Sequence, residues 1–129
     1  FEATVNSIVK YSWHKKTGAV AGSERMAAYF REKAKQRMLD AGSKTVHGDF
    51  LACSNFDLSE RLEEIAVPVL VIASDGDRMV PLKVSREMAE NLPNAEFVSL
   101  ENCGHFQHIE QTAKVAGELV TFLSKLRET

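Results

Sequence analysis

Asp77 and His105 are the two side chains in this sequence whose types and surroundings point to a reaction. Asp77 lies in residues 68–81, PVLVIASDGDRMVP, and His105 lies in residues 101–110, ENCGHFQHIE. A carboxylate that accepts the Nδ1 proton of an imidazole fixes the tautomer of the ring. It also stabilises the imidazolium that forms when the ring takes a proton from a hydroxyl nucleophile. We therefore expect Asp77 and His105 to form a hydrogen-bonded pair of acid and general base.

Two short strands must position this pair. Residues 69–73 are apolar at every position, which is typical of a strand in a parallel sheet that is buried on both faces. Residues 95–100 form the second predicted strand, and a helix separates the two. Asp77 follows the first strand and His105 follows the second, so both fall at the carboxyl ends of neighbouring strands, where the active loops of open α/β sheets lie.

Apolar residues at helical spacing predict helices over much of the remaining chain. We expect helices over residues 1–14, 24–41, 44–53, 58–65, 81–92 and 111–127, and loops over residues 15–23, 75–77 and 101–108. The expected helix-end residues are the N-cap Ser23, the C-cap Gly42, a capping box from Asp57 to Glu60, and Pro81 as a first helical residue. Three apolar stripes should be buried, namely Met26, Phe30, Ala34 and Met38; Val84, Met88 and Leu92; and Val115 or Ala116, Leu119, Leu123 and Leu126.

The order of these features resembles the C-terminal half of an α/β-hydrolase. In that family the nucleophile comes first in the chain, then the acid, then the histidine. FDLSERLEEIAVPVLVIASDGDRMVP looks like the segment that enters the last two strands of cap-bearing members, and NAEFVSLENCGHFQHIEQ looks like their histidine loop. Glu110 follows His105 at a spacing the family often shows, whereas Ser74 stands where the family usually has glycine. The resemblance implies an α/β fold with a short parallel sheet, a helical cap-like segment over residues 1–55, and core strands and helices over residues 56–129.

The nucleophile elbow of that family, G-x-S-x-G, does not occur in these 129 residues. Four serines lie outside any such glycine-flanked turn, namely Ser23, Ser43, Ser54 and Ser74, and we interpret Ser74 as structural. Cys103 precedes His105 by two residues, so a Cys–His nucleophile pair is conceivable. We favour a buried, packing role for Cys103 and for Cys53.

The resemblance implies a serine hydrolase of a small ester, lactone or related acyl substrate, in which Asp77 orients His105 as general base. Members with an aspartate nucleophile share these segments, so the bond that is cleaved stays open. Without an elbow the isolated chain should be inactive. The alternative is a non-catalytic binding or assembly module that retains the scaffold, with Asp77 and His105 as relics. The coding sequence upstream of Phe1 would distinguish the two.

Composition and histidine spacing exclude several other classes. Sixteen basic and eighteen acidic residues give a net charge of −2, so nucleic acid is not an expected partner. The longest apolar run, residues 65–73, is too short to cross a membrane. His14, His47 and His108 have no metal-ligand spacing, and we expect neither a metal nor a cofactor.

Cysteine usage and strand edges give expectations about location and assembly. Two cysteines make no disulfide framework and no signal peptide is visible, so a reducing cytoplasm is expected. The outer edge of the strand at residues 69–73 would expose unpaired backbone groups. We expect it to pair with the missing N-terminal half of a hydrolase, or with a second copy of the chain in a homodimer. His47, Phe50 and Trp13 are candidates to line a substrate pocket, but we favour an ordinary packing role for them.

Overall fold

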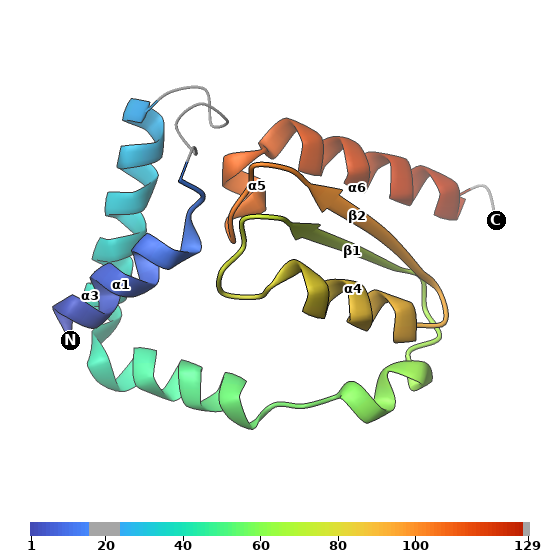
Figure 1. Cartoon of the computed structure of the whole chain (residues 1–129), viewed down its shortest axis with the longest axis horizontal. Helices are drawn as coiled ribbons and strands as arrows, with labels where there is room; N and C mark the ends of the chain where they lie inside the picture. The colour runs from blue at the N-terminus through green and yellow to red at the C-terminus, as the bar shows by residue number, and fades with distance from the viewer. Residues whose placement is uncertain (16–23, 128–129) are drawn as a thin grey trace.

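A two-stranded parallel sheet forms the centre of the C-terminal part of the chain (Figure 1). The structure is a computed structural model that describes residues 1–15 and 24–127. β1 (Val69–Ser74) pairs with β2 (Ala95–Leu100) in register, from Val69 opposite Ala95 to Ser74 opposite Leu100. α4 (Leu82–Asn91) connects the strands along one side of the sheet, and α6 (Thr112–Arg127) lies along the other. The predicted strand–helix–strand–helix order is confirmed.

The N-terminal part of the chain is helical, and its buried cluster also contacts Phe106 and Ile109 of the C-terminal part. α1 (Glu2–Ser12) crosses α3 (Glu24–Asn55), which continues through a kink at Gly42, where φ is 81° and ψ is 161°. Glycine tolerates this backbone conformation, and it divides α3 into two arms that correspond to the predicted helices at residues 24–41 and 44–53. The N-cap prediction for Ser23 and the loop predicted at residues 15–23, apart from Lys15, fall outside the described residues.

Apolar side chains hold α1 against the first arm of α3. Val5, Val9 and Trp13 are buried, and the neighbours that pack on them include Phe30, Ala34 and Met38. Three of the four residues predicted to form the stripe on this arm therefore contribute to the packing. Met26 is 47% exposed, so that part of the prediction is wrong, because the neighbouring Ala27 takes the buried position at the start of the arm.

The buried face of α4 differs from the predicted one. Leu92 is buried as predicted, together with Ala89, against Val71 of β1, whereas Val84 and Met88 are exposed. The helix is therefore rotated relative to the prediction. The reason is that a two-stranded sheet covers only part of the helix, and the covered part includes the small Ala89.

The predicted burial of α6 is also wrong within the described residues. Leu119, Leu123 and Leu126 are 44%, 55% and 39% exposed, Val115 is half-buried and Ala116 is exposed. A sheet of two strands is too narrow to cover this helix. The same lack of cover leaves Leu70 and Ile72 of β1 only half-buried, so the strand is not buried on both faces as predicted.

Three element boundaries also differ from the sequence prediction. The predicted helix at residues 58–65 is a 3-10 helix, η1 (Ser59–Glu64), and Asp57 accepts hydrogen bonds from the Ser59 N–H and hydroxyl instead of capping Glu60. Pro81 is the N-cap of α4 and not its first residue. The predicted loop at residues 101–108 ends in a short helix, α5 (Gln107–Glu110), because the chain must turn there to enter α6.

Candidate active site

The carboxyl ends of β1 and β2 place the loop of Asp77 beside the loop of His105. Two backbone hydrogen bonds join the loops, from Asp75 N to Leu100 O at 3.1 Å and from Gly76 N to Cys103 O at 3.0 Å. These bonds extend the pairing of the two strands into the loops. The parallel register therefore determines how the acid and the histidine meet.

Asp77 and His105 form the predicted hydrogen bond. Nδ1 of His105 and Oδ2 of Asp77 are 2.9 Å apart, which is within the normal range for this type of bond. The Asp77 side chain is 4% exposed and the His105 side chain is 38% exposed. The pair therefore has a shielded carboxylate and an imidazole that reaches the surface of the described chain.

The carboxylate of Asp77 is oriented by its own loop. Its Oδ1 accepts hydrogen bonds from the backbone N–H groups of Met79 and Val80 at 2.8 and 2.9 Å. These two donors fix the plane of the carboxylate and leave Oδ2 directed at His105. An Asp at the start of a turn commonly accepts such bonds from its own backbone, which explains why the acid occupies this position.

The backbone of the histidine loop is held by the C-terminal end of α1. His105 N donates a hydrogen bond to Ser12 O at 2.8 Å, and His14 N donates to Oε2 of Glu110 at 3.1 Å. The rings of Trp13 and Phe106 pack with their centroids 5.1 Å apart. Sequence reasoning missed the first contact because it joins two backbones across most of the chain. For the second contact, the spacing of Glu110 from His105 was the only indication in the sequence.

Ser74 has a structural role within the described residues. It is fully buried at the end of β1, and its hydroxyl donates a 2.6 Å hydrogen bond to Gly104 O. Gln107 in turn donates to the Ser74 oxygen at 3.3 Å. A hydroxyl bonded in this way ties the strand to the histidine loop, as we interpreted it from the sequence.

The two cysteines lie in contrasting environments. Cys103 is fully buried, and burial, together with the nearby carboxylates of Glu110 and Asp75, raises the pKa of its thiol to about 12. It is therefore protonated at neutral pH and unsuited to act as a nucleophile. Cys53 is exposed, so its predicted place in the core is wrong. It lies near the end of α3, where the helix extends away from the packed part of the N-terminal unit.

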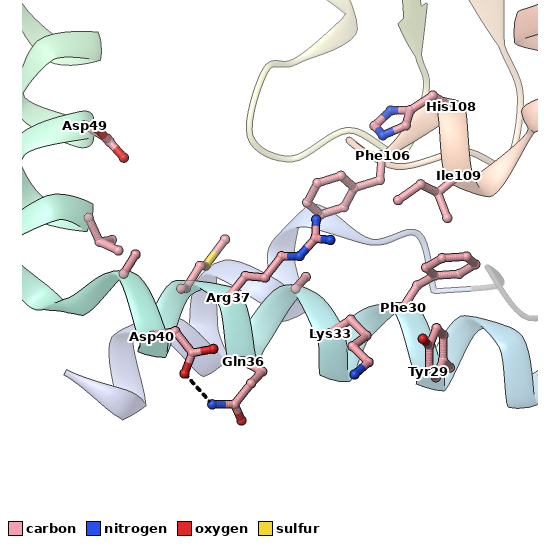
Figure 2. Close-up of a pocket in the computed structure, with 14 residues that line it drawn as sticks. Tyr29, Phe30, Lys33, Gln36, Arg37, Asp40, Asp49, Phe106, His108 and Ile109 are labelled. Carbon is pink, nitrogen blue, oxygen red and sulfur yellow. Dashed lines mark hydrogen bonds between the residues drawn. The ribbon is translucent and has the colours of Figure 1, made fainter.

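A cavity of about 780 Å³ lies between α3 and the residues that follow His105 (Figure 2). Phe106, His108 and Ile109 line it from the histidine loop, and Tyr29 and Phe30 face them from α3. The ring of Phe106 also lies 5.8 Å from the ring of His105, so the cavity begins next to the candidate base. Figure 2 shows Arg37 of α3 extending across it toward Phe106.

Of the three residues considered for a substrate pocket, Trp13 has the packing role that we favoured. Trp13 is buried in the α1–α3 packing and lines a smaller cavity of about 400 Å³ together with His14. His47 and Phe50 are exposed on the second arm of α3, where Val46 and Asp49 line the larger cavity instead.

Residues 1–15 and 24–127 contain no cluster of three metal-ligating side chains and no helix long and apolar enough to cross a membrane.

The contrast between the cysteines predicts which thiol reacts. In the native chain at pH 7.5, Ellman's reagent should modify Cys53 and leave Cys103 unmodified, because burial blocks access and keeps the Cys103 thiol protonated. In 6 M guanidinium chloride both thiols should react. The control is Cys53→Ser, which should show almost no rapid reaction in the native state. Rapid modification of Cys103 in that variant would restore it as a candidate nucleophile.

Comparison with known proteins gives relatives among hydrolases. A 2-hydroxy-6-oxononadienedioate/2-hydroxy-6-oxononatrienedioate hydrolase of Paraburkholderia phymatum is 41% identical over 69 residues, which are 54% of this chain and 24% of that protein. The enol-lactonase of Burkholderia xenovorans has a similar fold, with a TM-score of 0.82 and 20% identity over 95% of this chain and 44% of that structure. A thermophilic esterase of Thermogutta terrifontis gives a TM-score of 0.80 at 23% identity, over 95% of this chain and 43% of that structure.

A family model accounts for most of the chain. The model of the alpha/beta hydrolase fold matches residues 2–112, which include both strands, Asp77 and His105. The chain spans less than half the length of each of the relatives above. The matched residues and the shared fold show that this chain belongs to the α/β-hydrolase family.

Proposed function

We propose that this chain is the acid–histidine part of a hydrolase that cleaves a small ester, lactone or related acyl substrate. The observation that carries the proposal is the 2.9 Å hydrogen bond from His105 to Asp77, formed at the carboxyl ends of neighbouring parallel strands. Relatives named as an enol-lactonase, an esterase and a dienedioate hydrolase support this substrate class.

The geometry supports a different role for each member of the pair. Asp77 accepts the Nδ1 proton of His105, so Nε2 is left as the base. Nε2 takes the proton of a nucleophile hydroxyl while the nucleophile oxygen bonds to the carbonyl carbon of the substrate, and Asp77 stabilises the resulting imidazolium. As the bond to the leaving group breaks, Nε2 returns the proton to the leaving oxygen. Water then repeats the sequence on the acyl-enzyme.

The cavity between α3 and the histidine loop is the proposed place for the body of the substrate. Its volume of about 780 Å³ lies within the range of small-molecule sites, roughly 300–1,000 Å³. The aromatic rings of Phe30 and Phe106 offer apolar surface, and two basic and two acidic side chains line the α3 side, namely Lys33, Arg37, Asp40 and Asp49. This lining suits a substrate with an apolar body.

Activity is predicted to depend on residues beyond this sequence. With p-nitrophenyl acetate, the purified chain should show no turnover above that of its His105→Ala variant, because it lacks an elbow nucleophile and the oxyanion hole that accompanies it. In a longer polypeptide that contains an upstream G-x-S-x-G, Asp77→Ala should lower kcat by about ten-thousandfold and His105→Ala by about a millionfold.

The control for these variants is His47→Ala, which removes an exposed histidine on α3 and should leave kcat unchanged. Turnover by the isolated chain that depends on His105 would contradict the proposal. So would a longer polypeptide in which His105→Ala retains full activity.

The alternative proposal is a non-catalytic assembly module. The exposed apolar residues of α6, Leu119, Val120 and Leu123, favour it, because such a surface needs a partner. The coding sequence upstream of Phe1 separates the two proposals. An elbow motif after a strand supports the hydrolase, and a start codon at this position supports the module.

Both cysteines are free, which supports a cytoplasmic location under either proposal.

We further propose that β1 pairs through its outer edge with the N-terminal half of a hydrolase or with a second copy of the chain. Among the described residues β1 pairs with β2 alone, and a two-stranded sheet is a poor basis for independent stability. Sedimentation equilibrium at micromolar concentration should therefore give a mass above the 14.3 kDa of one chain. A well-folded monomer would show that β1 needs no further strand.

A further inference from the structure

Glu110 is a buried charged group that the proposed reaction does not use. It is the largest of the fully buried side chains in the described residues, with no exposed surface. Burial of a carboxylate is costly unless hydrogen bonds compensate for the lost hydration. One such bond comes from the N–H of His14, which donates to Oε2 at 3.1 Å. A buried carboxylate that binds a distant backbone segment requires an explanation.

The segment bound by Glu110 also holds the backbone of the candidate base. Ser12 O accepts the N–H of His105 at 2.8 Å, only two residues before His14. The end of α1 is thus fixed at two points, at His105 just before α5 and at Glu110, the last residue of α5. The imidazole is held at Nδ1 by Asp77 and its main chain is held by Ser12.

The end of α1 and the histidine loop are in close contact at Gly104. A Cβ added to Gly104 would lie 2.5 Å from His14 N, 2.7 Å from Oε1 of Glu110 and 2.9 Å from Ser12 O. The backbone of Ser12 and His14 therefore lies against the backbone at Gly104. A shift of the α1 end relative to the histidine loop would have to break at least one of the two hydrogen bonds.

We propose that Glu110 is a positioning residue, which fixes the end of α1 to the histidine loop and thereby sets the place of His105. Its meaning for catalysis rests on the hydrolase function proposed above. α1 also packs against the arm of α3 that lines the large cavity. Glu110 therefore links the helices that surround the proposed substrate to the group that would act on it. Small displacements of a catalytic group lower the reaction rate strongly, so loss of this link should lower turnover.

Backbone hydrogen exchange measured by NMR tests the proposal on the chain as it is. Glu110→Ala removes the acceptor of His14, and the amides of His14 and His105 should then exchange at least about tenfold faster, as expected for a lost buried hydrogen bond. The amides of the β1–β2 pairing, such as Val71, should change much less. Glu110→Gln keeps an acceptor oxygen and should restore protection of both amides to within about threefold of the original chain.

The control variant is Glu101→Gln, which removes a carboxylate from the exposed start of the same loop and should leave both amides unchanged. The proposal is overturned if Glu110→Ala leaves the His14 and His105 amides protected. It is also overturned if all amides accelerate equally, or if Glu110→Gln fails to restore protection. The measurement uses no substrate, so absence of hydrolysis would count against the proposed function and not against this role.

Discussion

The parallel pairing of β1 with β2 is the constraint on which the rest of this structure depends. In register from Val69–Ala95 to Ser74–Leu100, the strands end together, and the loops that leave them must run side by side. Backbone bonds from Asp75 and Gly76 continue the pairing into the loops. The contact between Asp77 and His105 follows from this arrangement. A slip of one residue would turn every side chain of the slipped strand to the other face and part the loops.

The N-terminal helices complete the arrangement by holding the histidine from the other side. Ser12, Trp13 and His14 lie against the loop through two hydrogen bonds and one pair of aromatic rings. The loop is therefore fixed between a strand end and a helix end, and a cavity opens where α3 faces Phe106. The separation of residues 1–55 from residues 56–129 stays a prediction, and these contacts show how closely the two segments cooperate around His105.

The sequence predicted the parts of this structure that depend on local pattern. A continuous apolar run marked β1, turn residues marked its end, and the position of Asp77 and His105 after neighbouring strands predicted their contact. The sequence prediction failed for helix faces whose burial depends on how much surface the sheet offers them. Spacing identified the stripes of α4 and α6, but Val84 and Leu123 are exposed because a two-stranded sheet cannot cover them. It also missed the bond from His105 to Ser12, because backbone atoms form it and no side-chain type encodes it.

We propose that Asp77 holds His105 in the tautomer with its proton on Nδ1 and leaves Nε2 as the base. The most direct test is long-range ¹H–¹⁵N NMR of the histidine rings, above the pH at which His105 is protonated. We predict that His105 carries its proton on Nδ1, and that Asp77→Asn disturbs this preference while the ring signals of His47 stay unchanged. A His105 ring with its proton on Nε2, unchanged by Asp77→Asn, would contradict this role of Asp77.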